Sequence, residues 1–169
     1  MSSENYSEIV VNDFDEEAAK KFRSQVFKRA SLDENLPIVI YIDSYGGQVY
    51  QCFGLLSVIE RSETPIHTIV TGCAMSAGFM ILISGHKRFA HKLSTPLYHQ
   101  VSSGTAGTVK EMEEKLEESK RLQKQLENIV KEKTDISKKK LREIFDTKKD
   151  WYMTSEEALE LNVVDEILK

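Results

Sequence analysis

Apolar runs and amphipathic stretches alternate along the first half of the chain. Residues 15–30 carry apolar side chains at the spacing of one helix face, with lysine and arginine between them, and helical spacing returns over 49–59. Short runs of β-branched or wholly apolar residues, typical of strands, lie at 9–11, 38–42 and 66–70. The order strand, helix, strand, helix, strand, joined by short links, predicts βαβ units and an α/β domain with a largely parallel sheet.

The middle of the chain begins with small residues. The apolar run 79–83 follows Ser76, and we expect a helix that begins near Ser76, although periodicity alone also allows a strand. Two short strands are expected next, at 88–90 and 97–99.

The remaining residues predict three helices. Residues 109–133 are almost all Glu, Lys, Gln, Arg and Leu, with a thin apolar stripe that lapses near Ser119. A narrow stripe indicates a helix that docks lightly or packs against a partner, and a monomer hides such side chains poorly, so we expect oligomerisation. Ser137 and Ser155 are good capping residues. They predict helices at 137–145 and 155–161.

Composition narrows the function classes. A chain of 169 residues, 40% of them hydrophobic, fits one domain with its own core. The net charge of −4 disfavours a nucleic-acid partner. Cys52 and Cys73 lie in apolar surroundings and match no disulfide framework or zinc spacing. The dinucleotide fingerprint, the P-loop and the HExxH, CxxC and EF-hand patterns are also missing, so we expect no metal and no other cofactor. The polar start is no signal peptide, and no apolar run approaches the roughly 18 residues of a membrane span, so we expect a cytoplasmic protein without a membrane partner.

Ser76 has the setting of a nucleophile. It lies between a predicted strand and a predicted helix, with Ala74 and Gly78 two positions away on either side. A nucleophilic serine on a sharp strand-to-helix turn needs small neighbours, because the backbone crowds there. The free N–H groups of a helix N-terminus can also bind a developing oxyanion. On its own, the pattern is more often a point of tight packing.

A serine nucleophile needs a base, and His99 is the best placed of the four histidines. It ends a predicted strand that leads into a loop rich in Ser, Gly and Thr, where site residues lie in open α/β sheets. His67 falls inside a predicted buried strand, whereas His86 and His91 lie in a basic stretch that we expect to face solvent.

The orienting carboxylate is less well defined. Asp43 ends a predicted strand and is reasonable by position, and the other aspartates considered are Asp146, Asp150 and Asp165. Composition cannot choose among them. The Gly46-Gly47 pair lies between a strand and a helix, so it forms either a tight turn or a close approach of backbone to ligand.

Five short motifs follow one another in a defined order. They are Asp43-Ser44-Tyr45-Gly46-Gly47, Gly72-Cys73-Ala74-Met75-Ser76, Tyr98-His99-Gln100, the segment from Asp146-Thr147 through Lys149-Asp150-Trp151-Tyr152-Met153-Thr154 to Glu157-Ala158, and Asn162-Val163-Val164-Asp165-Glu166-Ile167. In this order they resemble the proteolytic subunit of the Clp protease, from about residue 8 to the end. Each motif alone is weak, and Tyr45 stands where that family usually has proline.

The resemblance implies a role for each matching residue. Ser76 is expected to be the nucleophile, His99 the general base and Asp146 the orienting carboxylate. The backbone N–H groups of Gly47 and Ala77 are expected to form the oxyanion hole. The implied reaction is hydrolysis of polypeptides through an acyl-enzyme, in which His99 takes the Ser76 proton and returns it to the leaving amine.

The resemblance also implies a fold and a mode of substrate binding. The fold is α/β, ClpP/crotonase-like, built of repeated ββα units with a protruding handle helix. The whole chain, 1–169, then forms one peptidase domain, with the head at about 8–108 and 134–169 and the handle at about 109–133. Gly104, Thr105 and Ala106 fall where the family pairs an extended peptide with a strand edge.

The implied partners are copies of the chain and polypeptide substrates. We expect a heptameric ring enclosing a chamber. Stacking of two rings is left open, because Phe145 stands where the family tends to have a basic residue used between rings. The chain begins almost at its first predicted strand, so we expect the axial N-terminal loop to be missing, which leaves use of an AAA+ unfoldase open.

Three other functions remain open at the level of sequence. The same site could serve a phage-type maturation protease that cleaves a capsid or scaffold protein. The chain could be an inactive structural subunit of a mixed ring, although Ser76, His99 and Asp146 are all present. A crotonase-like protein that binds an acyl-CoA would use similar glycine loops but would not need the Ser-His-Asp set.

Overall fold

The computed structural model describes residues 7–31 and 36–169. The N-terminal residues 1–6, on which the expectations of a missing axial loop and of no signal peptide depend, lie outside these ranges, as do residues 32–35 of the loop before the second strand. Within the described residues, no helix is both long enough and apolar enough to cross a membrane.

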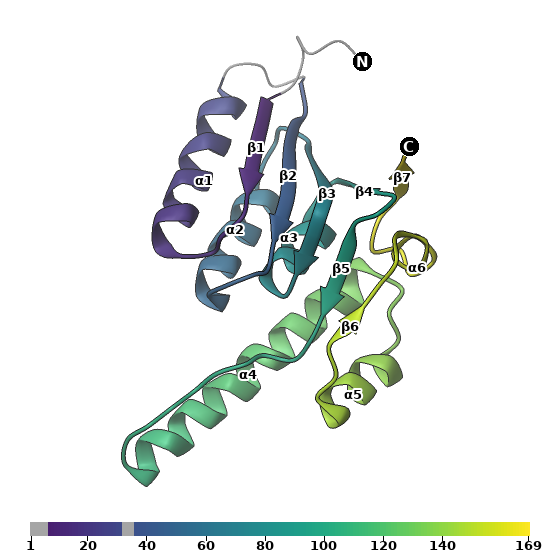
Figure 1. Ribbon diagram of the computed structural model, residues 1–169. Coiled ribbons are helices and arrows are strands. Elements are labelled where there is room, and N and C mark those ends of the chain that lie inside the picture. The colour runs from purple at the N-terminus through teal and green to yellow at the C-terminus, as the bar shows by residue number, and fades with distance from the viewer. Residues whose placement is uncertain (1–6, 32–35) are drawn as a thin grey trace.

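A mostly parallel sheet forms the centre of the molecule (Figure 1). Its strands are β1 (Ser7–Val11), β2 (Ile38–Ser44), β3 (Ile66–Met75), β4 (Lys87–His91), β5 (Thr95–Tyr98), β6 (Trp151–Tyr152) and β7 (Glu166–Leu168). The main path runs β1-β2-β3-β4-β7, and β5 pairs with β3 and with β6. All pairs are parallel except β5–β6. The predicted α/β class with a largely parallel sheet is therefore confirmed.

The helices are α1 (Glu16–Ala30), α2 (Val49–Glu60), α3 (Ala77–Ser84), α4 (Val109–Lys133), α5 (Lys138–Thr147) and α6 (Ser155–Glu160). The five helices predicted up to residue 145 are confirmed, and Ser137 caps α5 by accepting a hydrogen bond from Lys140 N. The cap predicted at Ser155 is wrong by one residue, because Thr154 caps α6. The Ser155 hydroxyl is instead buried and donates to the backbone carbonyl of His91 at 2.8 Å.

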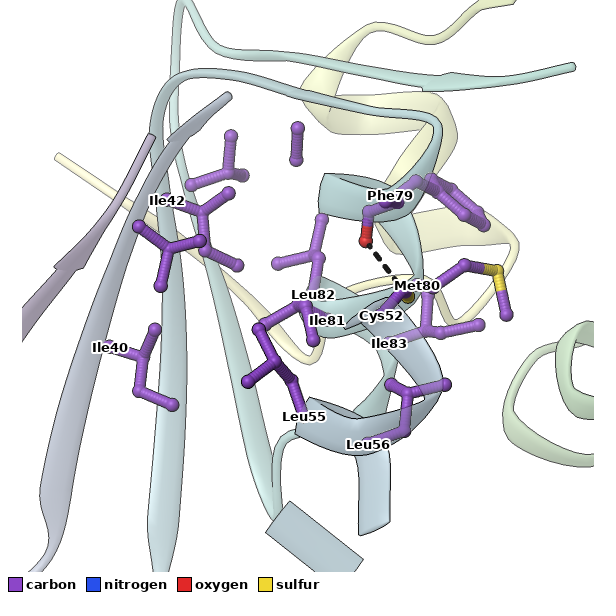
Figure 2. Close-up of a cluster of buried hydrophobic side chains, with 14 of the residues drawn as sticks. Ile40, Ile42, Cys52, Leu55, Leu56, Phe79, Met80, Ile81, Leu82 and Ile83 are labelled. Atoms are coloured by element: carbon purple, nitrogen blue, oxygen red, sulfur yellow. Dashed lines mark hydrogen bonds between the residues drawn. The ribbon is translucent and has the colours of Figure 1, made fainter. Parts of the chain in front are cut away.

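The core explains why the run at 79–83 showed no helical periodicity. Every residue of α3 is buried, and a helix covered on all sides is apolar on all sides. Figure 2 shows the apolar side chains of α3 gathered in one cluster with Ile40 and Ile42 of β2 and with Leu55 of α2. The helix that follows Ser76 is therefore locked in place by packing.

Arg88 ties the C-terminal segment to the sheet. Its side chain is largely buried, at 8% exposure, and donates to both oxygens of Asp165, to the backbone carbonyls of Lys133 and Asn162, and to the Asn162 side chain. Burial would raise the pKa of Asp165, but the hydrogen bonds and charge of Arg88 outweigh it and hold that pKa below its usual value. One side chain thus joins β4, the end of α4 and the approach to β7.

Replacing Asp165 by asparagine removes the charge that Arg88 holds. We expect the free energy of unfolding to fall by about 1–2 kcal/mol near neutral pH, because Arg88 keeps its burial but loses its counter-ion. The wild-type advantage is present above the ordinary carboxyl pKa of about 4 and is lost as the pH falls through the lowered folded-state pKa. Urea unfolding across this range measures it. Asp146→Asn, which affects only an exposed ion pair, is the control with a change under about 0.5 kcal/mol. A constant difference at every pH would contradict the expectation.

Candidate active site

Ser76 lies at the junction of β3 and α3 in a strained conformation. Its φ of 54° and ψ of −115° are unusual for a residue with a side chain. Such a backbone conformation persists only where the surrounding structure imposes it. Its backbone N–H donates to Leu97 O at 3.1 Å, which fixes the turn to β5. Ala77 is the first residue of α3, so its N–H has no partner within the helix. The hydroxyl of Ser76 is therefore presented beside a helix N-terminus.

The Gly46-Gly47 loop packs directly against Ser76. Gly46 has φ 101°, and a Cβ there would lie 2.7 Å from the Cβ of Ser76. Gly47 has φ 157°, and its Cβ would lie 2.8 Å from that of Phe14. A side chain at Gly46 would push the loop away from Ser76, and one at Gly47 would push it away from Phe14, so this glycine pair is a close backbone approach.

Pairing of β3 with β5 brings His99 to the same place. The two strands are parallel, with Met75 opposite Leu97, so Ser76 and His99 follow the carboxyl ends of neighbouring strands. Side chains at that edge of an open α/β sheet converge on one crevice. Both residues line one pocket, together with Gly47 and Ala77. The structure thus brings together four of the predicted site residues.

The structure does not bring Asp146 to His99. The Asp146 carboxylate accepts from Arg142 Nε at 2.9 Å, one turn back along α5. Asp150 lies at the imidazole instead, with its Oδ1 3.5 Å from His99 Nδ1. This distance is within reach of an ion pair and slightly longer than a hydrogen bond. The carboxylate beside His99 in the structure is therefore that of Asp150 and not that of Asp146, which the resemblance had implied.

Asp150 reaches this position through the strand β6, which the sequence pattern did not predict. Lys148 adopts a left-handed conformation, with φ 53°, and ends α5. The chain then enters β6, where Trp151 pairs with Tyr98 in antiparallel register. The next positions outward on the two strands are Asp150 and His99, so the register itself sets the carboxylate opposite the base.

The pocket beside Ser76 has a volume of about 130 Å³ and an apolar wall. Val49 and Cys52 come from α2, Met80 from α3 and Leu126 from α4. Burial raises the pKa of the Cys52 thiol to about 12, and Figure 2 shows this thiol donating to the carbonyl of Ala77. Burial likewise raises the pKa of Cys73. Both thiols are therefore protonated near neutral pH, and a protonated thiol is a poor nucleophile.

The other sequence candidates have structural partners elsewhere. Asp43 accepts a hydrogen bond from Cys73 N at 3.0 Å and thereby holds an irregularity in the β2–β3 pairing. His86 Nδ1 accepts from Ile66 N at 3.0 Å. His67 packs on Phe89, and partial burial lowers its pKa. Within residues 7–31 and 36–169, no cluster of three or more His, Cys, Asp or Glu side chains is placed to hold a metal ion.

The segment predicted to bind substrate is extended and exposed. From β5 the chain runs alongside α4 to the far end of that helix (Figure 1). Ser103 Oγ lies 3.0 Å from Ser119 Oγ, and a Cβ at Gly104 would meet nothing within 4 Å. Residues 104–106 form no strand here, so their pairing with a peptide stays a prediction.

A model of the Clp protease family matches residues 5–169. The chain belongs to the Clp protease family. This membership makes it a peptidase of the Clp type, whose family chemistry uses serine, in agreement with the resemblance of the five motifs.

Curated members of the Clp family align with most of the chain. An ATP-dependent Clp protease proteolytic subunit 2 of Treponema denticola is 30% identical over 163 residues, which are 95% of this chain and 80% of the relative. The proteolytic subunit of Porphyromonas gingivalis is 32% identical over 158 residues, or 92% and 70% of the two chains. The subunit 2 of Treponema pallidum is 28% identical over 163 residues, or 95% and 81%.

Proposed function

We propose that this Clp family member is a serine endopeptidase that hydrolyses unfolded polypeptides through an acyl-enzyme. The observation that carries the proposal is the alignment of Ser76, His99 and Asp150 at one sheet edge, with the hydroxyl and imidazole on a common pocket. His99 takes the proton of Ser76 as the hydroxyl attacks a peptide carbonyl, then gives it to the leaving amine. Asp150 orients the imidazole. His99 then takes a proton from a water molecule, which attacks the acyl-enzyme and releases the product and Ser76.

Backbone amides of Gly47 and Ala77 complete the proposed site. The Ala77 N–H begins α3 and has no partner within that helix, and the Gly46-Gly47 loop lies against Ser76 at contact distance. Two donors on either side of the nucleophile would stabilise the negative charge of a tetrahedral intermediate. An acyl-CoA enzyme could use such donors, but the Ser-His-Asp line beside them favours peptide hydrolysis.

A fluorophosphonate probe tests these assignments directly. We expect covalent labelling of Ser76 by peptide mapping, no labelling of Ser76→Ala, and hydrolysis of an unfolded protein by the wild type alone. Asp150→Asn should lower kcat/KM by about 10³–10⁴-fold, because the imidazole loses its orienting partner. Asp146→Asn, four residues away on α5, is the matched control and should stay within about twofold.

The contrary outcomes are distinct. A native particle that is neither labelled nor active would indicate the inactive ring subunit. Activity confined to one capsid or scaffold protein would favour the maturation protease. If Asp146→Asn were the damaging change, the carboxylate assignment made from the structure would be wrong.

The pocket supports a preference for an apolar side chain next to the scissile bond. Its wall is formed by Val49, Cys52, Met80 and Leu126. An apolar cavity of about 150 Å³ can hold benzene, so a pocket of this size suits a branched aliphatic group better than an indole. The exposed backbone of residues 104–106 would hold the rest of the peptide in an extended form, with little side-chain selectivity.

Shortening Leu126 should widen this preference. We expect Leu126→Ala to raise kcat/KM for an aromatic relative to a leucine side chain at the scissile bond by about tenfold, because several carbons leave the wall. Paired fluorogenic peptides that differ only at this position measure the ratio. Leu159→Ala, on the exposed face of α6, is the control with an unchanged ratio. An unchanged ratio in Leu126→Ala would place the binding pocket elsewhere.

Copies of the chain are proposed to form a heptameric ring that encloses the sites. The protruding half of α4 carries three exposed apolar side chains at spacings of three and four residues, Val109, Met112 and Leu116. This face needs a cover in water, and a second copy of the chain is the cover that Clp family membership favours. Stacking of two rings would cover the same face. The proposal does not include an AAA+ unfoldase as a partner.

Native mass spectrometry tests the assembly. We expect a particle of seven chains or of fourteen, whose peptidase activity follows the assembled fraction on dilution. The double variant Met112→Glu/Leu116→Glu should form a native particle of lower mass, because two charges on the apolar face disfavour contact between copies. A fully active monomer at micromolar concentration would refute the ring.

A further inference from the structure

Gln123 is the one buried polar residue among the described residues of α4, since every other polar side chain of that helix is exposed or partly exposed. Only Leu122, Gln123 and Val130 are buried among the residues of α4, and Gln123 is 6% exposed. A buried amide is costly unless its donors and acceptor are satisfied. The partners of this amide therefore show what the position does.

Those partners lie on both sides of His99. Gln123 Oε1 accepts from Val101 N at 2.7 Å, and its Nε2 lies 3.4 Å from the hydroxyl of Tyr98. Nε2 also donates to Glu127 Oε1 at 2.8 Å. A carboxylate can only accept, so Glu127 turns the Nε2 end toward itself and leaves Oε1 for Val101. One side chain of α4 thus contacts Tyr98, directly before His99, and Val101, two residues after it.

His99 needs this support because its other constraints are weak. β5 ends at Tyr98, and the residues that follow belong to no helix or strand until α4 begins. Asp150 is 54% exposed and 3.5 Å from the imidazole, and an exposed pair at that distance holds a side chain loosely. Two residues after His99, the short bond from Val101 N to Gln123 Oε1 anchors the segment to α4.

We infer that Gln123 is a positioning residue for the general base. The inference rests on the proposed peptidase function. Gln123 acts through the backbone of Val101 and through Tyr98 and contacts no substrate. It holds the imidazole where it can reach Ser76 and Asp150 at once, and a displacement of about 1 Å at such a group can cost about 100-fold in rate.

Replacing Gln123 by methionine, of similar length and without polar atoms, tests this role. We expect Q123M to lower kcat for a fluorogenic peptide by about 10- to 100-fold while KM stays within about twofold, because the base moves and the pocket does not. Q125M makes the same substitution two positions along, on the exposed face of α4, and should leave both constants unchanged.

A charge-conserving swap provides the rescue. Q123E keeps an acceptor for Val101 but sets two carboxylates four residues apart, so it should also be impaired. In Q123E/E127Q the introduced carboxylate accepts from Val101, and the introduced amide donates to it. This double variant should recover kcat to within about threefold of the wild type, which a loss of packing alone would not explain.

The outcomes separate the two levels of the proposal. Unchanged kcat in Q123M, or no rescue by the swap at equal thermal stability, overturns the role of Gln123 while wild-type labelling at Ser76 still stands. Absence of that labelling refutes the proposed function itself. If Q123M fails to fold, Q123E against Q123E/E127Q decides by the same criterion.

Discussion

The pairing of β5 with β6 is the interaction on which the candidate site depends. It consists of two residue pairs, Leu97 with Tyr152 and Tyr98 with Trp151, extended by a bond from Met153 N to Pro96 O at 2.9 Å. A slip of one residue would turn every side chain of β6 to the opposite face and remove Asp150 from His99. Burial of Met153 and the Lys140 ammonium over the Trp151 ring, at 4.8 Å, oppose such a slip.

The strained backbone of Ser76 persists because packing and hydrogen bonding fix the chain on both sides of it. A positive φ in a residue with a side chain costs about 1–3 kcal/mol. On one side, α3 is buried along its whole length. On the other side, Ser76 N donates a hydrogen bond to Leu97 O, and the backbone of Gly46 lies so close that a side chain there would not fit. The apolar run 79–83 is thus both the centre of the core and the support that presents the hydroxyl.

Much of this could be predicted from local patterns, and the exceptions have a common cause. Periodicity located α1 and α4, and strand ends placed Ser76 and His99 at one edge of a parallel sheet. The resemblance assigned the carboxylate to Asp146, and the residues alone could not choose among the aspartates. A strand of two residues gives no periodic signal, although its long-range register sets which aspartate lies beside His99. The aromatic pair after Asp150, typical of strands, was the available clue. Gln123 was missed since a glutamine on a charged helix gives no sign of burial.

Helix α4 links the pocket to the exposed apolar face. Its C-terminal half supplies Leu126 to the pocket and Gln123 to the segment around His99, while its N-terminal half protrudes beyond the sheet (Figure 1). Where the halves meet, Glu118 accepts from Arg121 and from Tyr50 on α2, and these bonds lower the pKa of Glu118 to about 2, so the contact keeps its charge near neutral pH. Both halves belong to one continuous helix, Val109–Lys133. A partner on the protruding half would therefore contact the same helix that carries Gln123, the residue proposed to position the base.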